Sequence, residues 1–160
     1  MSLADKLAGA HYRYPDHYDV EREKIREYAR AVKATDRACY DERAAAELGY
    51  DGLAASPTYI SIFGYQVISG FFEEIGVAVS DAQIVQVDQK LAFRRPIKEG
   101  DRLYCDLYVD SVRRAHGTDI IVTRQTVTDE TGEIVQETYT TLAGRAGDGD
   151  EDGGFTDVVA

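Results

Sequence analysis

The sequence predicts an α+β domain in which a curled antiparallel sheet wraps one long central helix. Two observations lead to this prediction. The stretch 56–76 carries so many apolar residues that, at the helical period of about 3.6 residues, they cover most of its circumference. Four segments in which apolar and polar residues alternate come after it, separated by turn signals, as in an antiparallel meander. A helix that is apolar on most sides needs a cover on most sides, and a curled sheet supplies one.

We expect the central helix to run from Ser56 to Gly76. Ser56 is suited to accept hydrogen bonds from amides of the first turn, and Pro57 has the fixed φ of a first helical position. Gly76 provides the stop. Gly64 and Gly70 lie inside the helix, where each costs about 1 kcal/mol relative to Ala. Their presence predicts that another segment approaches the helix backbone closely.

The four strands are expected at about 83–93, 103–110, 119–128 and 133–143. In the first strand, one face is interrupted by a polar residue, Gln89, and otherwise consists of Val85, Val87, Leu91 and Phe93. A long central helix followed by such a meander is the hot-dog architecture. Sheets of this kind keep an open edge, which two copies or two related chains close by pairing, so we expect a dimer.

Shorter elements precede the central helix. The run 21–33 places its apolar residues on one face and predicts a surface helix. The second half of 34–50 is helical in composition and ends at Gly49. We therefore expect a single hot-dog domain over residues 1–146. Residues 147–160 are acidic and rich in glycine, which predicts a disordered tail.

Composition narrows the class of protein. The 160 residues include 18 Lys and Arg against 29 Asp and Glu, a formal charge of −11, which argues against nucleic acid and anionic membranes as partners. The two cysteines, Cys39 and Cys105, lie outside any CxxC spacing and indicate free thiols in a reducing compartment. No apolar run reaches the length of a membrane span, and the N-terminus lacks the pattern of a signal peptide. We expect a soluble, cytoplasmic protein.

Four segments resemble a known family, and together they cover most of the chain from His11 to Gly147: HYRYPDHYDVEREKIREYARAV, ELGYDGLAASPTYISIFGY, IVQVDQKLAFRRPIKEGDRLYCDLYVDSV and IVQETYTTLAGRAG. They resemble the A-type (HadA-type) subunits of the mycobacterial (3R)-hydroxyacyl-ACP dehydratase, MaoC-like hot-dog proteins of type II fatty-acid synthesis. The resemblance implies a heterodimer with a B-type catalytic subunit. It also implies dehydration of (3R)-hydroxyacyl chains on the phosphopantetheine of acyl carrier protein, during elongation toward mycolic acids and without a further cofactor.

The residues themselves bear on whether this chain is catalytic. Dehydration of a β-hydroxyacyl thioester needs a base, an acid and hydrogen-bond donors for the thioester oxygen. Active relatives carry a D-x-N-P-x-H motif before the central helix, and the matching place here, Asp36 to Tyr40, keeps only the Asp. The three histidines lie elsewhere, at His11, His17 and His116. We therefore expect no catalytic residue in this chain, and we interpret Asp36 as a loop or capping residue.

The start of the central helix leads to the same expectation. Active relatives of the family begin this helix with a His-Gly step whose backbone amide can hold the thioester oxygen. Here Ser56 and Pro57 occupy that region, and proline has no amide hydrogen to donate. Two of the three chemical requirements are thus missing by residue type.

Polar residues that interrupt apolar faces are the candidates for substrate binding. Ser61 and Tyr65 lie four residues apart on the central helix and share a face, while Gln86 and Gln89 come from the strand expected across it. Phe71 and Phe72 are assigned to the far end of an acyl tunnel. Three alternatives stay open: Gln86 faces solvent, Ser61 bonds back to its helix, and Tyr65, Phe71 and Phe72 are plain core residues.

Weaker signals complete the set. Arg94, Arg95 and Lys98 form a basic patch that either meets an acidic carrier protein or its phosphate, or is only a solvated turn. The acidic run that starts at Asp148 lacks the ligand spacing of a calcium loop, so we expect no metal. Cys105 alternates with core residues and is expected to be a buried structural thiol.

Two further functions remain as alternatives. One is a self-sufficient, homodimeric (R)-specific enoyl thioester hydratase that would use Asp36 with Tyr40 as its acid. The other is a noncatalytic acyl-binding hot-dog module. The sequence leaves open whether the isolated chain forms homodimers.

Overall fold

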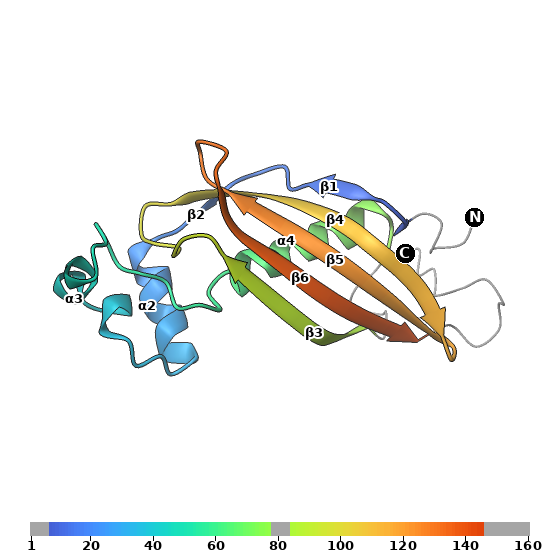
Figure 1. Cartoon of the computed structure of the whole chain (residues 1–160), viewed down its shortest axis with the longest axis horizontal. Coiled ribbons are helices and arrows are strands. Elements are labelled where there is room, and N and C mark those ends of the chain that lie inside the picture. Colours follow the sequence, from blue (N-terminus) through green and yellow to red (C-terminus); the bar gives the residue numbers. More distant parts are fainter. Residues whose placement is uncertain (1–6, 78–83, 146–160) are drawn as a thin grey trace.

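The alternating segments form the long strands that the sequence predicts. A computed structural model describes residues 7–77 and 84–145, which leaves the predicted acidic tail outside the described residues. The strands are β1 (His11–Arg13), β2 (Tyr18–Asp19), β3 (Ile84–Phe93), β4 (Arg102–Ala115), β5 (Thr118–Thr128) and β6 (Ile134–Arg145). They form one antiparallel sheet in the order β1-β4-β5-β6-β3, with β2 pairing to β4 (Figure 1). The curled sheet lies against one long helix, which confirms the predicted hot-dog fold.

The central helix, α4 (Ser61–Glu74), begins later than predicted. Ser56 is not its cap, because the Ser56 hydroxyl oxygen has no hydrogen-bond partner. Instead, the amides of Tyr59 and Ser61 donate to carbonyls three residues earlier, at distances of 3.0 Å each. The fixed φ of Pro57 suits such turns as well as it suits a first helical turn. This explains why the sequence predicted a helix start at Ser56. The predicted stop is confirmed, since Gly76 has a φ of 74° just after the helix.

Close contacts explain both glycines of α4. A Cβ atom at Gly64 would lie 2.9 Å from Oε1 of Gln125, and one at Gly70 would lie 2.5 Å from the hydroxyl oxygen of Tyr12. The predicted approach of other segments to the helix backbone is therefore confirmed. The buried face of α4 consists of Phe63, Val67, Phe71 and Phe72.

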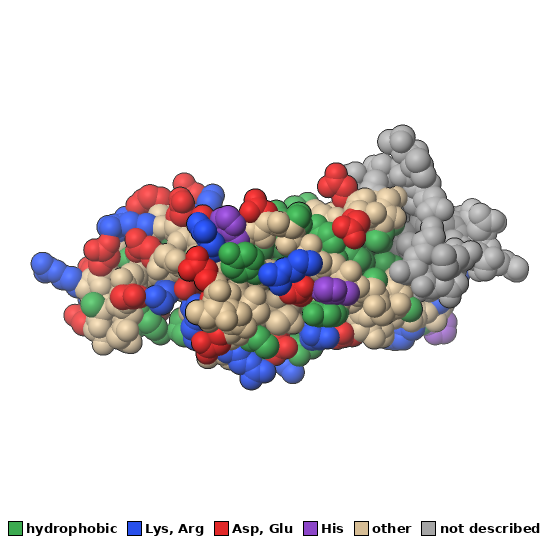
Figure 2. Space-filling model, turned by 90° about the horizontal axis from the view of Figure 1, so that it is seen from above, with side chains coloured by type: hydrophobic (Ala, Val, Ile, Leu, Met, Phe, Trp, Pro, Cys, Tyr) green, Lys and Arg blue, Asp and Glu red, His purple; other side chains and the backbone are tan. Residues whose placement is uncertain are grey.

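Three short helical elements form one end of the molecule (Figure 1): α2 (Arg22–Ala31), the 3-10 helix η1 (Arg37–Cys39) and α3 (Glu42–Glu47). Ile25 and Ala29 of α2 are buried, so the predicted surface helix packs with one face. Figure 2 shows acidic and basic side chains interspersed over this end of the molecule. None of the helices within the described residues has both the length and the apolar character needed to cross a bilayer.

Strand β3 differs from its predicted pattern. Its register against β6 shifts between Gln86 and Asp88, which marks a β-bulge. A bulge exchanges the two faces of a strand, so the expected shared face of Val85, Val87, Leu91 and Phe93 is wrong. Val85 and Val87 are 61% and 58% exposed, whereas Leu91 packs against the core. The bulge decides which polar side chains face α4.

Candidate functional site

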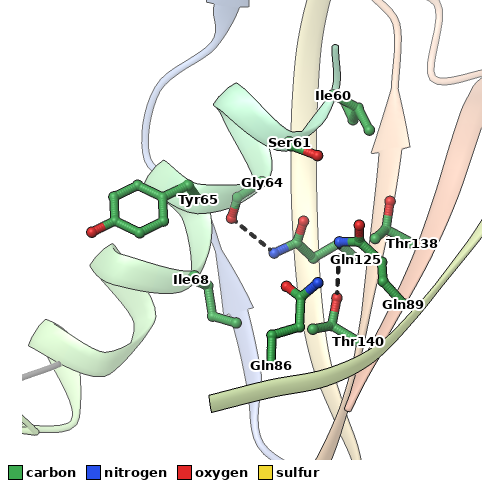
Figure 3. Close-up of a pocket in the computed structure, with 10 residues that line it drawn as sticks. All are labelled: Ile60, Ser61, Gly64, Tyr65, Ile68, Gln86, Gln89, Gln125, Thr138 and Thr140. Atoms are coloured by element: carbon green, nitrogen blue, oxygen red, sulfur yellow. Dashed lines mark hydrogen bonds between the residues drawn. The ribbon is translucent and has the colours of Figure 1, made fainter. Parts of the chain in front are cut away.

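A cavity of about 280 Å³ lies between α4 and the inner face of β3, β5 and β6 (Figure 3). Its lining includes four of the six side chains predicted to bind substrate, namely Ser61, Tyr65, Gln86 and Gln89. The other lining residues are Ile60, Gly64, Ile68, Gln125, Thr138 and Thr140. The structure therefore brings the two predicted residues of α4 together with the two predicted residues of β3.

The β-bulge is what allows both glutamines to face the cavity. In a regular strand, residues three apart point to opposite faces, so only one of Gln86 and Gln89 would face α4. The extra residue at the bulge restores the alternation, and both side chains lie on the helix side. Both also remain largely exposed, because β3 is an edge strand. The cavity thus opens along this edge.

The sheet side of the cavity is a row of buried polar groups. Gln125 pairs across β5 and β6 with Thr138, and Thr140 pairs across β6 and β3 with Gln89. Gln125, Thr138 and Thr140 are 3%, 3% and 4% exposed. The Gln125 amide nitrogen donates to the carbonyl of Gly64 at 3.0 Å, and the Gln89 amide nitrogen donates to the Thr140 hydroxyl at 3.5 Å (Figure 3). This lining offers amides and hydroxyls to a ligand as well as apolar contact.

Sequence reasoning missed Gln125, Thr138 and Thr140. The available signal was their place in the alternation of β5 and β6, where each occupies a buried, inward position. A polar residue at an inward strand position indicates either a buried hydrogen bond or a cavity wall. The criterion that selected Gln89 fits Gln125, whose inward row on β5 also holds Ile121 and Val127. It does not fit Thr138 and Thr140, because their inward row on β6 is mostly polar.

The two predicted residues of α4 point in different directions. Figure 3 shows the Ser61 hydroxyl directed toward the strands, whereas the Tyr65 ring points away from them. Tyr65 is 69% exposed, so the alternative that it is plain core is wrong. Its ring is free to contact a partner chain or a ligand at the mouth of the cavity.

Phe71 and Phe72 lie outside the lining of this cavity. They are 2% and 1% exposed, and their ring centroids lie 5.5 Å apart within the core. Phe71 also packs against Tyr12, at 6.0 Å between ring centroids. Their assignment to the far end of a tunnel stays a prediction, and their observed contacts are those of core residues.

The place of the missing catalytic motif is occupied by structural hydrogen bonds. The Asp36 carboxylate accepts from the amide of Ala38 at 2.9 Å and caps η1, as expected for a capping residue. The Tyr40 hydroxyl donates to the carbonyl of Ala34 at 2.7 Å. Both side chains of the alternative acid-base pair therefore hold the backbone around η1.

None of the three histidines lies beside Asp36. His11 approaches Asp106 at 2.7 Å between Nε2 and Oδ1, on β1 and β4. His17 lies near Asp16 and Asp19. His116, with a φ of 51°, is in the turn between β4 and β5. The Asp-His pair of active relatives is thus absent from this position.

Acidic residues neutralise the basic patch. Arg95 makes ion pairs with Asp101 at 2.8 Å and Asp129 at 3.3 Å, and the hydrogen bond with Asp101 raises the pKa of the Arg95 guanidinium. Lys98 pairs with Asp51 at 2.5 Å, and Arg94 pairs with Glu137 at 3.0 Å. The Arg94 side chain is 61% exposed, against 28% for Arg95. Carrier docking at these residues stays a prediction, with Arg94 the most accessible of the three.

Both cysteines are buried free thiols, as expected for Cys105. Burial raises the pKa of the Cys105 thiol to about 12 and also raises that of Cys39. Within the described part of the chain, no group of three His, Cys, Asp or Glu side chains is placed to hold a metal ion.

Residues 6–138 match the family described as "FAS1-like, dehydratase domain region". The chain is also 61% identical over 160 residues to a UPF0336 protein of Mycobacterium leprae, with all of both chains covered. A UPF0336 protein of Mycobacterium tuberculosis is 45% identical over 149 residues, which is 93% of this chain and 90% of that protein. The chain therefore belongs to the UPF0336 family and carries its FAS1-like dehydratase region.

Solved structures support the same class. A chain of the C-terminally truncated HadBC (3R-hydroxyacyl-ACP dehydratase) complex of Mycobacterium tuberculosis matches with a TM-score of 0.82 and 44% identity, covering 89% of this chain and 100% of that one. A MaoC-like dehydratase matches with a TM-score of 0.82 and 36% identity over 91% of this chain and 44% of that one. The chain is a dehydratase hot-dog domain and a homologue of the HadBC dehydratase.

Proposed function

We propose that this chain is the noncatalytic, substrate-binding and stabilising subunit of a heterodimeric (3R)-hydroxyacyl-ACP dehydratase in type II fatty-acid elongation toward mycolic acids. One observation carries the proposal. The Asp36 carboxylate, the remaining member of the catalytic motif, is engaged as the cap of η1, and the histidines lie on other elements. A domain of dehydratase type without its acid-base pair needs a partner that supplies one.

The loss of the oxyanion donor supports the noncatalytic role. Proton removal next to a thioester places negative charge on the thioester oxygen, and backbone amides stabilise that charge when they are fixed toward it. Pro57 has no amide hydrogen, and the amides of Tyr59 and Ser61 already donate to carbonyls within the turns before α4. Three of the residues at the start of α4 therefore supply no free amide to a developing oxyanion.

The cavity between α4 and β3 supports the substrate-binding role. Its volume of about 280 Å³ lies just below the range of about 300–1,000 Å³ that is usual for ligand sites. It is open along the β3 edge, so a partner that covers this edge extends it. We assign the acyl chain to this cavity, with Ser61, Tyr65, Gln86 and Gln89 in contact with it.

The edge of β3 supports a partner subunit. β3 pairs with β6 on one side, and no strand within residues 7–77 and 84–145 pairs with its other side. Val85, Val87 and Phe93 on this strand are 61%, 58% and 49% exposed. An open, apolar edge strand of this length is normally covered by another chain. The related HadBC structure is a complex, and the partner proposed here is a B-type catalytic subunit.

Activity measured with and without the partner tests the proposal. The chain alone, and the chain co-expressed with a B-type subunit, would be assayed for hydration of enoyl thioesters and for dehydration on acyl carrier protein. We expect activity only from the co-expressed pair. Activity of the chain alone would instead support the homodimeric hydratase, and no gain on co-expression would support the acyl-binding module.

A further inference from the structure

The face of the sheet turned away from α4 carries an ordered pattern of its own. The odd-numbered residues of β5 are buried, so its even-numbered residues lie on the opposite, outer face. Directly paired residues of neighbouring antiparallel strands share a face. The registers therefore extend this outer face from β5 over β4 on one side, and over β6 and β3 on the other.

Part of the outer face is apolar. Ile120 of β5 pairs with Ala143 of β6, and Ala143 pairs with Val85 of β3. Val122 lies beside Ile120 on the same face, two residues further along β5. All four side chains are at least partly exposed. We call them the outer apolar patch. Contiguous exposed apolar side chains commonly mark an interaction site.

Basic side chains border the outer apolar patch. Arg113 of β4 pairs directly with Ile120. In the row beyond Val122, Arg124 lies over the ring of Tyr108, and Lys90 lies over the ring of Tyr139. Arg113 and Lys90 are exposed, and neither makes an ion pair with an acidic residue of the described ranges. Both are therefore available to an acidic partner.

The acidic side chains of the same face leave these cations available. Asp110 pairs with Arg124 at 3.4 Å, and Asp88 pairs across the strands with Thr141. In the next row, Asp106 and Glu137 are already paired with basic side chains. On a chain with a formal charge of −11, the border of the patch is thus a place where basic side chains gather. It suits a partner that is acidic and carries a few apolar residues.

The C-terminal segment of this chain has that composition. Residues 148–152 read DGDED, with four acidic residues and no basic one, and Phe155, Val158 and Val159 follow them. β6 ends at Arg145, which pairs with Thr118 next to the β4–β5 turn, at the same end of the sheet as the patch (Figure 1). The chain therefore leaves β6 beside the surface that its C-terminal segment complements.

The length of the C-terminal segment is sufficient. The 15 residues 146–160 span up to about 50 Å when extended. The distance along β6 from Arg145 back to Tyr139 is six residues, or about 20 Å. After turning back at Gly147, the segment can thus pass over the whole patch and reach its basic border.

We propose that residues 148–159 bind the outer apolar patch of their own chain. Phe155, Val158 and Val159 cover the patch, and the acidic run 148–152 lies against its basic border. A segment of this composition forms no core of its own, but it can order on a surface that supplies apolar and basic partners. Because the segment is tethered, its effective concentration is on the order of millimolar, and weak contacts are sufficient. The outer face is then closed to other proteins, and the β3 edge stays open.

A nitroxide label on the C-terminal segment of the full-length chain tests the proposal. The label is attached through Gly154→Cys at neutral pH, where the two native thiols are buried and protonated. Amide NMR signals near the label lose intensity relative to the reduced, diamagnetic label. We expect this loss for Ile120, Val122 and Ala143. The signals of α3, at the opposite end of the molecule, should keep their intensity (Figure 1).

Variants of the labelled chain test the contacts. Arg113→Glu combined with Lys90→Glu should weaken binding of the segment about threefold to tenfold, and the signals of the patch should recover accordingly. Arg43→Glu, the same change at an exposed position of α3, should leave the loss unchanged. Phe155→Ser tests the apolar contact without any change to the sheet and should also restore the signals. In 1 M salt, where the screening length is about 3 Å, the loss should decrease.

Other outcomes overturn the proposal. These are full intensity of the patch signals, an equal loss at α3, or an unchanged loss in both the Glu variant and the Ser variant. Nitroxide-labelled chain without isotopes is also mixed with isotope-labelled chain that has no nitroxide. Loss of patch signals in this mixture would assign the patch to a second copy instead. The experiment uses neither substrate nor partner subunit, so its result is independent of the proposed function.

Discussion

At the scale of single residues, Gln125 and Gly64 depend on each other. The Gln125 amide nitrogen donates to the Gly64 carbonyl at 3.0 Å, while its Oε1 occupies the space that a Cβ at Gly64 would need, 2.9 Å away. The pair fixes α4 against β5 at the wall of the cavity between α4 and the β3 edge. A residue without a side chain thus defines one wall of the site.

Gly64→Ala should therefore destabilise the chain although alanine favours helices. The Cβ would displace the buried Gln125 amide and break its hydrogen bond to the Gly64 carbonyl, and an unpaired buried amide costs about 1–3 kcal/mol, against a gain of about 1 kcal/mol in helix propensity. The free energy of unfolding in urea measures the effect. In a Gln125→Ala background, the same change should be neutral or stabilising, because the obstructing amide is gone. An equal effect in both backgrounds would contradict the assigned contact.

Asp36 allows a second test at the same scale. Asp36→Asn keeps an oxygen that can cap η1 but removes the charge that a catalytic base needs. We expect the co-expressed pair to retain activity within about twofold of the wild type. Asp36→Ala, which removes the cap, should cost about 1 kcal/mol of stability and leave activity intact. A large loss of turnover in the Asn variant would instead support the alternative function, a hydratase that uses Asp36 and Tyr40 as catalytic residues.

At the scale of elements, β3 separates what the sequence could predict from what it could not. Its bounds followed from its apolar residues and turn signals, and the structure places it within one residue of the prediction at the start. The faces were wrong because the bulge between Gln86 and Asp88 depends on register against β6, fifty residues further along the chain. Local alternation carries no information about such a long-range pairing.

The open edge of β3 carries the prediction for this element. Val85→Lys combined with Val87→Lys should weaken association with a B-type subunit at least tenfold, because two charges would have to lose water at the proposed interface. Light scattering after size-exclusion chromatography measures the assembly. Ile134→Lys changes an apolar side chain that is 38% exposed on β6 and should have no effect. Undiminished assembly of the β3 variant would place the interface elsewhere.

At the scale of the whole molecule, composition and periodicity were sufficient for the fold. The all-round apolar helix and the four alternating strands leave few ways to bury their faces, and the structure uses the predicted one. The site was predicted in part, because Ser61 and Tyr65 share a face of α4 and Gln89 interrupts an apolar row of β3, whereas Gln86 joins them through the bulge. The unpaired hydroxyl of Ser56 was not predicted, because the local sequence indicates a helix cap and only the tertiary structure shows that this hydroxyl has no partner.

The two buried thiols have a consequence for following the motions of this chain. A thiol reacts as the thiolate, and burial raises the pKa of Cys39 and raises that of Cys105 to about 12. At neutral pH the folded chain therefore holds both sulfurs protonated and covered. Alkylation proceeds only from conformations that have opened, at η1 for Cys39 and at β4 for Cys105. The alkylation rates of the two thiols therefore report separately how often η1 and β4 open.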